Sequence, residues 1–122
     1  MSGRVLVVED EVLVAMMIEN MLDELGYTLV DTAADLKTAV DKAHATEADV
    51  ALIDVDLAGF FSFPAAVVLG TRNIPFAFTT GHGADVQFPK DMYDAPRLIK
   101  PFSYDELKLI LTILMCRGGK DG

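Results

Sequence analysis

The sequence predicts an α/β domain with a doubly wound, five-stranded parallel sheet of strand order 2-1-3-4-5, arranged as a three-layer sandwich. Two observations predict it. Short apolar runs alternate with segments of helical periodicity, and strands joined through helices form parallel sheets covered on both faces. Several of these runs also end in polar residues, and open α/β sheets bind their ligands at the carboxyl ends of the strands.

Five apolar segments are the predicted strands. The most apolar is Asp49–Asp54, in which four apolar residues run directly into the carboxylate of Asp54, so we expect burial on both faces. The other four are Arg4–Val8, Thr28–Ala33, Pro75–Thr80 and Arg97–Ile99. Helical or turn-rich segments separate them, so the expected order along the chain is a strand followed by a helix, repeated five times.

Capping residues and helix breakers mark the first three predicted helices. The first runs from the acids after Val8 to Leu25 and stops at Gly26. Asp35 can cap a second helix that ends near Thr46. The third, from Phe63 to about Arg72, has a proline in its first turn, where proline is well tolerated.

The remaining segments are less regular. Val55–Ser62 is a predicted loop. Between Gly83 and Pro96 the periodicity is weak and prolines intervene, so any helix there is predicted to be short or mobile. Ser103-x-x-Glu106 is a capping box that opens a final helix to about Cys116.

Composition limits the classes of function. A chain of 122 residues is expected to be a single domain over residues 1–122, with a core of about 4–116 and no output domain. The formal charge of −9 argues against binding nucleic acid or an anionic membrane. A single cysteine, no leader and no apolar run near the length of a membrane span indicate a cytoplasmic protein.

Four of the predicted strands end in residues that can meet at one edge of the sheet. Glu9 and Asp10 follow the first strand, Asp54 ends the third, Thr80 the fourth, and Lys100 follows the fifth. In the strand order 2-1-3-4-5, the first and third strands are neighbours where the order reverses. We therefore expect Asp10 and Asp54 to face each other across that crevice.

The acidic part of this edge predicts a metal ion and phosphoryl transfer. Carboxylates packed together repel one another unless a cation is present. Hard oxygen ligands suit Mg²⁺ rather than zinc. A carboxylate beside Mg²⁺ can act as the nucleophile of phosphoryl transfer and form an aspartyl phosphate. A lysine ammonium would balance the phosphoryl charge, and a threonine hydroxyl could hydrogen-bond a phosphoryl oxygen.

Four motifs, V-L-V-V-E-D-E, A-L-I-D-V-D-L, F-T-T-G and L-I-K-P-F, are distributed across nearly the whole chain. In this order they resemble the receiver domains of bacterial two-component response regulators, which have a flavodoxin-like, CheY-like fold. The resemblance implies a phosphoryl group from a sensor histidine kinase or phosphotransfer protein. The outcome would be changed partner binding, or transfer as a phosphate shuttle or sink, without the turnover of an enzyme. A cis peptide at Lys100-Pro101 is also implied.

The resemblance also assigns a role to each polar residue at the edge. Asp54 corresponds to the phosphoacceptor, Thr80 to the switch hydroxyl and Lys100 to the invariant lysine. The Mg²⁺ ligands would be the side chains of Glu9, Asp10 and Asp54 and the backbone carbonyl of Asp56. Thr79 and Thr80 point to opposite faces of their strand, so only one can reach the phosphoryl group, and Thr79 is expected to pack in the core.

A narrower resemblance lies in P-F-A-F-T-T-G-H, Pro75–His82, together with the S-F-P of Ser62–Pro64. These residues are similar to a group of stand-alone alphaproteobacterial receivers named for a Phe-Ala-Thr-Gly-Tyr-like signature. That group is often associated with HWE or related histidine kinases. Here Thr79 stands in place of the usual alanine and His82 in place of the aromatic residue.

Two positions depart from the broader family. Most receivers carry Tyr or Phe three residues before the lysine, and this residue turns inward on phosphorylation; here it is Arg97. The loop after Asp54 also lacks the usual Met-Pro pair. We therefore expect the loop Gly81–Pro96 to carry the switch by changing its order.

The last helix is apolar beyond its core stripe. Leu107, Ile110, Leu111 and Leu114 can dock it on the sheet. Leu109 and Ile113 lie on a different face, with Met115 nearby, and such a second face is typical of contact with a partner. The prediction is a homodimer, or a docking surface for a kinase or target.

Three alternative functions remain. Asp54-x-Asp56 resembles the Asp-x-Asp signature of haloacid-dehalogenase-type phosphatases, although that signature normally lies near the start of its domain; sustained turnover of a small phosphate ester would identify this class. A flavin-binding domain needs a Ser/Thr/Gly-rich loop where this chain has Glu9-Asp10-Glu11. The third is a pseudo-receiver that binds partners without phosphorylation, against which the intact acid, threonine and lysine set argues.

Overall fold

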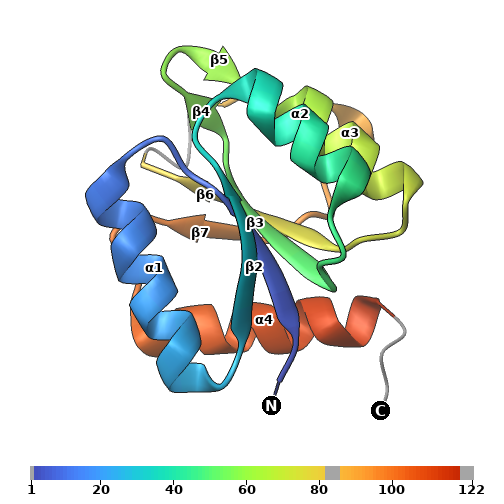
Figure 1. Cartoon of the computed structure of the whole chain (residues 1–122). Helices are drawn as coiled ribbons and strands as arrows, with labels where there is room; N and C mark the ends of the chain where they lie inside the picture. Colours follow the sequence, from blue (N-terminus) through green and yellow to red (C-terminus); the bar gives the residue numbers. More distant parts are fainter. Residues whose placement is uncertain (1, 82–85, 119–122) are drawn as a thin grey trace.

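The chain folds into a three-layer α/β sandwich (Figure 1). A computed structural model describes residues 2–81 and 86–118. The central sheet has five parallel strands in the order β2-β1-β3-β6-β7. Counted along the sheet strands alone, this is the predicted order 2-1-3-4-5, which confirms the fold class.

The five sheet strands agree with the predicted segments to within one residue at their starts. They are β1 (Arg4–Val8), β2 (Thr28–Ala33), β3 (Val50–Asp54), β6 (Phe76–Thr80) and β7 (Arg97–Ile99). Every residue of β3 is buried. The apolar run before Asp54 is therefore the centre of the sheet, between β1 and β6.

The predicted capping residues set the helix ends. The helices are α1 (Val12–Leu25), α2 (Leu36–Ala45), α3 (Phe63–Thr71) and α4 (Tyr104–Arg117). Gly26 takes a φ of 88° beyond α1, a left-handed conformation that favours glycine. Asp35 accepts a hydrogen bond from the backbone N–H of Thr38 at 2.8 Å. Ser103 and Glu106 form the reciprocal capping box of α4.

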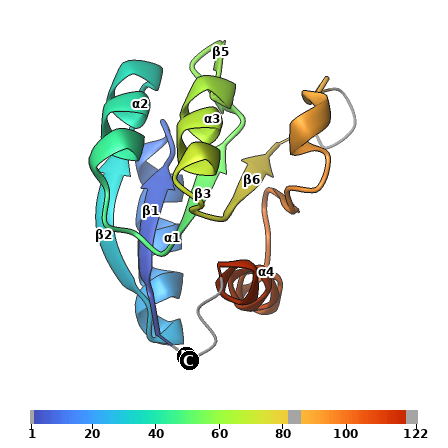
Figure 2. The same cartoon turned by 90° about the vertical axis from the view of Figure 1, so that its right-hand side faces the viewer.

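Each face of the sheet carries its own hydrophobic core, and the two helix layers in Figure 2 cover these faces. The core beneath α2 and α3 includes Leu6, Val8, Ile53, Ala39, Leu69 and Phe78. The core beneath α1 and α4 includes Val5, Val7, Leu52, Leu22, Leu107 and Leu111. Alternate residues of β1 and β3 thus enter opposite cores, as the period of two in a strand requires.

The predicted fourth repeat of strand and helix is kept only as a short helix in the residues described between β6 and β7, as the weak periodicity there predicted. Residues 86–96 contain only the short 3₁₀-helix η1 (Lys90–Met92), which follows Pro89. Prolines at 89 and 96 lack the N–H that helix continuation needs, and the residue before each is biased away from helical conformation. Met92, buried at 5% exposure, fills the core instead of a helix.

The predicted loop Val55–Ser62 contains a small antiparallel hairpin. Its strands are β4 (Asp56–Leu57) and β5 (Phe60–Phe61). The connecting residues Ala58 and Gly59 both have positive φ angles, 54° and 96°. Positive φ at both positions is typical of the two-residue turns that match the twist of a hairpin. Ala-Gly is a weaker sequence signal for such a turn than Asn-Gly, so the sequence pattern did not reveal it.

The α4 helix has the predicted second face only in part. Leu109 is 61% exposed and Ile113 is half-buried. Met115, which was expected near that face, is instead buried in the core with Tyr27. None of the helices in the described parts of the chain is long and apolar enough to cross a membrane.

Candidate functional site

The predicted polar residues meet at the carboxyl edge of the sheet. A cleft of about 650 Å³ opens there, and its lining includes Asp10, Asp54, Asp56, Phe61, Thr80 and Lys100. Asp54 and Thr80 end β3 and β6, and the acids after β1 and Lys100 after β7 follow at the same edge of the parallel sheet. The geometry places the whole predicted set at this edge, with Glu9 beneath the cleft rather than in its lining.

Lys100 bridges two acids from different strands. Its Nζ donates hydrogen bonds to Asp54 Oδ2 at 3.0 Å and to Glu9 Oε1 at 3.1 Å. Burial lowers the pKa of Lys100, but the hydrogen bonds to the two carboxylates outweigh this effect, so the pKa is raised overall. Lys100 is therefore a cation at neutral pH. The Lys100-Pro101 peptide is cis, as the resemblance implied.

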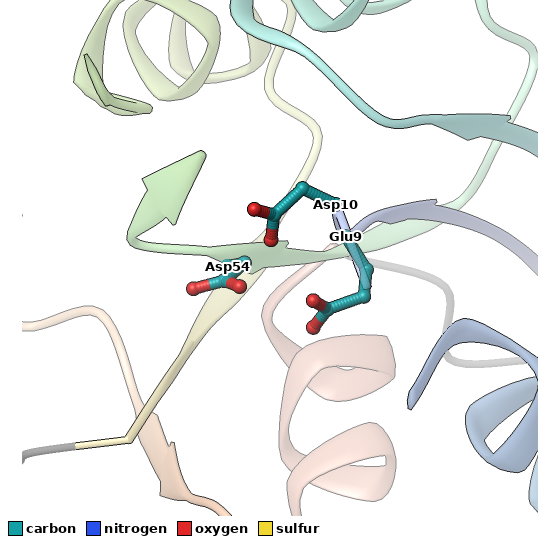
Figure 3. A group of neighbouring side chains, drawn as sticks. All are labelled: Glu9, Asp10 and Asp54. Carbon is teal, nitrogen blue, oxygen red and sulfur yellow. The ribbon is translucent and has the colours of Figure 1, made fainter. Parts of the chain in front are cut away.

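Three carboxylates lie close together at this edge of the sheet. Figure 3 shows Glu9, Asp10 and Asp54 at the ends of β1 and β3, and one oxygen from each lies within 4.8 Å of the others. Burial raises the pKa of Glu9 to about 7; the N–H of Glu11 opposes this shift and the charge of Asp54 adds to it. A full set of ionised carboxylates here calls for more positive charge than Lys100 alone supplies.

Hydrogen bonds leave Asp10 as the most available of the three acids. Both oxygens of Glu9 accept hydrogen bonds, from Lys100 and from the N–H of Glu11. Both oxygens of Asp54 also accept one, from Lys100 and from the N–H of Asp56. No hydrogen bond joins the half-buried Asp10 carboxylate to another described residue. Hard carboxylate oxygens with unused lone pairs, open to a cleft, fit Mg²⁺.

The two threonines of β6 are placed differently. Both are almost fully buried, and Thr79 lies opposite Asp54 in the pairing of β3 with β6. Thr80 contributes to the wall of the cleft, whereas Thr79 does not. The location of Thr80 is the one that the sequence predicted for the switch hydroxyl, whose role stays a prediction.

The hairpin β4–β5 belongs to the site and was missed by sequence reasoning. Its residue Asp56 is exposed, and the Asp56 carboxylate accepts a hydrogen bond from the N–H of Gly59 at 2.7 Å. Phe61 of the hairpin lines the cleft although its side chain is 54% exposed. The signal that could have found it is the Ala58-Gly59 pair between two short apolar-containing segments.

Arg97 lies outside the cleft lining at the edge of the sheet. Its guanidinium sits 3.7 Å from the centre of the Phe88 ring, a cation–π contact. Phe88 in turn packs against Phe63 and Phe78, with ring centroids 5.6 Å and 5.2 Å apart. Most receivers carry an inward-turning aromatic residue at this position. Here Arg97 instead contacts Phe88, in the segment before β7. His82 lies outside the described residues.

The family follows from comparison with known proteins. Residues 5–112 match the response regulator receiver domain. The chain belongs to this family. It is therefore a receiver domain of a two-component response regulator, and its CheY-like fold agrees with the sheet order described above.

The receiver domain resembles part of longer regulators. It is 33% identical over 117 residues to the transcriptional regulatory protein PdtaR of Mycobacterium tuberculosis, a match that covers 93% of this chain and 57% of PdtaR. The chain thus spans little more than half the length of that relative.

Two solved structures are similar to most of this chain. The solution structure of SdrG from Sphingomonas melonis Fr1 is 39% identical, with a TM-score of 0.80 over 92% of this chain and 95% of SdrG. The receiver domain of the sensor histidine kinase PA1611 from Pseudomonas aeruginosa PAO1 is 26% identical, with a TM-score of 0.75 over 98% of this chain and 99% of that one. That structure has a magnesium ion coordinated in its active site cleft.

Proposed function

We propose that this receiver domain accepts a phosphoryl group on Asp54, with Mg²⁺, from a histidine kinase or phosphotransfer protein. The observation that carries the proposal is the position of Asp54 between Lys100 and Asp10, at the floor of a cleft wide enough for a phosphoryl group. The match of Pro75–His82 to the narrower receiver group favours an HWE-type kinase as the donor. Because such kinases make phosphohistidine from ATP, the exchange would occur in the cytoplasm.

The transfer uses residues already in place. A carboxylate oxygen of Asp54 bonds to phosphorus as the P–N bond of a phosphohistidine breaks, and the electron pair of that bond stays on the imidazole nitrogen. Lys100 then pairs with the new phosphoryl oxygens, and the Thr80 hydroxyl donates a hydrogen bond to one of them. Mg²⁺, when bound by Asp10, Asp54, Glu9 and the Asp56 carbonyl, would neutralise phosphoryl charge.

The test is intact-mass spectrometry after incubation with a small phosphodonor, with and without Mg²⁺. We expect a gain of one phosphoryl group that requires Mg²⁺, is lost in Asp54→Asn, and is kept in the exposed control Asp41→Asn. If the small donor gives no product, a panel of kinases replaces it. Phosphorylation that persists in Asp54→Asn, or failure with every donor, would overturn the proposal in favour of a pseudo-receiver.

We propose further that the domain transfers and loses only the phosphoryl group on its own Asp54, and that it is not a phosphatase that turns over small phosphate esters. The Asp-x-Asp pattern of Asp54 and Asp56 invites comparison with phosphatases, but Asp56 directs its carboxylate to the N–H of Gly59. A phosphatase of that type would use this second acid to donate a proton to the leaving group. Sustained release of phosphate from a small ester, beyond one equivalent of protein, would contradict this view.

The output of such a domain is a change in what it binds. The phosphorylated form would alter a partner surface, or hand its phosphoryl group onward as a shuttle or sink. We include a single-domain organisation in this proposal, supported by the match to SdrG over 95% of that chain. We also include a dimer through α4, supported by Leu109, which is 61% exposed on that helix.

A further inference from the structure

We propose that the Asp56 carboxylate is a positioning group for Asp54: it closes the hairpin β4–β5 and thereby holds the Asp56 N–H on the Asp54 carboxylate. This inference rests on the proposed phosphorylation of Asp54. It assigns to the Asp56 side chain a role separate from that of its backbone carbonyl. The hairpin β4–β5 then serves to position the Asp54 carboxylate.

A continuous set of hydrogen bonds connects the turn to Asp54. Asp54 Oδ1 accepts from the N–H of Asp56 at 3.1 Å, and Asp56 Oδ1 accepts from the N–H of Gly59 at 2.7 Å. Beyond the hairpin, the N–H of Ser62 donates to the carbonyl of Val55 at 3.0 Å. The Asp56 backbone is therefore fixed on one side by its own carboxylate and on the other by the pairing of β4 with β5.

The turn needs this hydrogen bond because its backbone is unfavourable. Ala58 has a φ of 54°, in the left-handed region that residues with a Cβ rarely adopt. Gly59, with a φ of 96°, supplies the second positive angle. Asp56 offsets the unfavourable Ala58 conformation by accepting the Gly59 N–H, and Leu57, at 1% exposure, anchors β4 in the core. The carboxylate therefore adds a side-chain restraint at the turn to the backbone pairing of β4 with β5.

The consequence for the site is the orientation of Asp54. Lys100 holds one Asp54 oxygen and the Asp56 N–H holds the other, so together they set the plane of the carboxylate. Loss of one of two such constraints lets a nucleophile rotate away from the line of attack, and small misplacements lower rates strongly. The side chain of Asp56 thus acts on the reaction through Asp54 and not by touching the phosphoryl group.

The experiment compares Asp56→Ala with Asp56→Asn. Alanine removes the acceptor of the Gly59 N–H, whereas asparagine removes the charge and keeps an acceptor oxygen in the same place. We expect Asp56→Ala to slow Mg²⁺-dependent phosphorylation by about tenfold or more, and Asp56→Asn to recover most of that loss. The exposed Asp94→Ala is the control and should leave the rate unchanged.

A second variant changes Gly59, the residue that donates the hydrogen bond to the Asp56 carboxylate. Among the described residues, no atom beyond the chain neighbours of Gly59 lies within 4 Å of a Cβ added there, so Gly59→Ala should act through its φ of 96°. We expect it to slow phosphorylation as Asp56→Ala does. If Asp56→Ala and Asp56→Asn are equally slow, the charge of Asp56 is what matters, and the positioning role is overturned.

An NMR measurement keeps the two proposals apart. Asp54→Asn should shift the Asp56 amide resonance strongly in the wild type and in Asp56→Asn, because that amide bonds to residue 54, but only weakly in Asp56→Ala. This result requires no phosphorylation. If the wild type is never phosphorylated but the amide resonance of residue 56 shifts as expected, the proposed function fails. The inference that the hairpin positions Asp54 is then still supported. An equal amide shift in Asp56→Ala would overturn the inference even where phosphorylation succeeds.

Discussion

Lys100 Nζ lies 3.0 Å from Asp54 Oδ2, which joins residues that are 46 positions apart in the chain. The Lys100 side chain is 16% exposed and that of Asp54 is 7% exposed, so water screens this ion pair far less than a surface pair. Glu9 shares the same ammonium group from a fully buried position. One cation thus stabilises two acids that would otherwise repel each other at the end of the sheet.

Removal of this cation should destabilise the metal-free protein. Lys100→Met would leave Glu9 and Asp54 without their shared partner, and buried polar groups that lose a partner cost about 1 to 3 kcal/mol. Urea unfolding in a chelator gives the free energy of unfolding. The control is Lys37→Met, which removes the exposed Lys37–Asp41 pair of α2 and should cost less than about 0.5 kcal/mol. Equal losses in the two variants would contradict this account of Lys100.

Glu9 should make the stability of the metal-free protein fall as the pH rises. Folding raises the pKa of Glu9 from 4.5 to about 7, chiefly through burial. Between these values the native state keeps a proton that the unfolded state has released, so the Glu9 contribution is present below about 4.5 and is lost as the pH passes through about 7.

The pH measurement is urea unfolding in a chelator at pH 5 and pH 8, with Glu9→Gln as the reference. The wild type should lose more unfolding free energy between the two pH values than Glu9→Gln, because glutamine does not titrate. Mg²⁺ should reduce the loss at pH 8 by favouring the ionised acids. A Glu9→Gln curve parallel to that of the wild type would show that Glu9 does not titrate in this range.

Sheet and caps were predictable because their signals are local. The run before Asp54 and the residues Gly26, Asp35 and Ser103 each express a short-range preference that the fold respects. The short helix η1 was predictable from the weak periodicity and the two prolines, but the packing of Phe88 and Met92 into the core was not, because these apolar contacts are tertiary.

The candidate site was predictable as a set, because strand ends in a parallel sheet share one edge. The sequence did not predict which of the acids faces the cleft and which lies beneath it. That Glu9 lies beneath the cleft while Asp10 faces it depends on which oxygens Lys100 and the Glu11 N–H occupy. The Asp56–Gly59 bond depends on a turn whose Ala58 is an unusual choice for positive φ.

Arg97 should restrain the segment before β7. Arg97→Ala removes a cation–π contact worth about 0.5 to 1 kcal/mol at an exposed site, and amide exchange of residues 86–88 should become faster. Hydrogen–deuterium exchange measured by mass spectrometry follows it. Arg97→Lys should have a smaller effect, because an ammonium keeps the charge but stacks less well on a ring. Unchanged amide exchange of residues 86–88 in Arg97→Ala would show that Arg97 does not restrain this segment.

The same exchange measurement tests where the switch lies. If the segment after β6 carries it, phosphorylation of Asp54 should change amide exchange in the described part of that segment, residues 86–95, and Asp54→Asn should abolish the change. The reason is that Arg97 replaces the aromatic side chain that would otherwise turn inward. Exchange that is unaltered by phosphorylation would place the switch elsewhere.

The exposed face of α4 should bind a second copy of the chain or a kinase. Leu109 is 61% exposed, while Leu107, Leu111 and Leu114 already anchor the helix in the core. Covering a leucine of this kind contributes about 1.5 to 3 kcal/mol. We expect Leu109→Glu with Ile113→Glu to weaken self-association in sedimentation experiments, or kinase binding if the protein is a monomer. Asn20→Glu with His44→Glu adds similar charge at exposed positions of other helices and should have little effect. A monomeric wild type whose kinase binding survives the double substitution in α4 would show that this face has no partner.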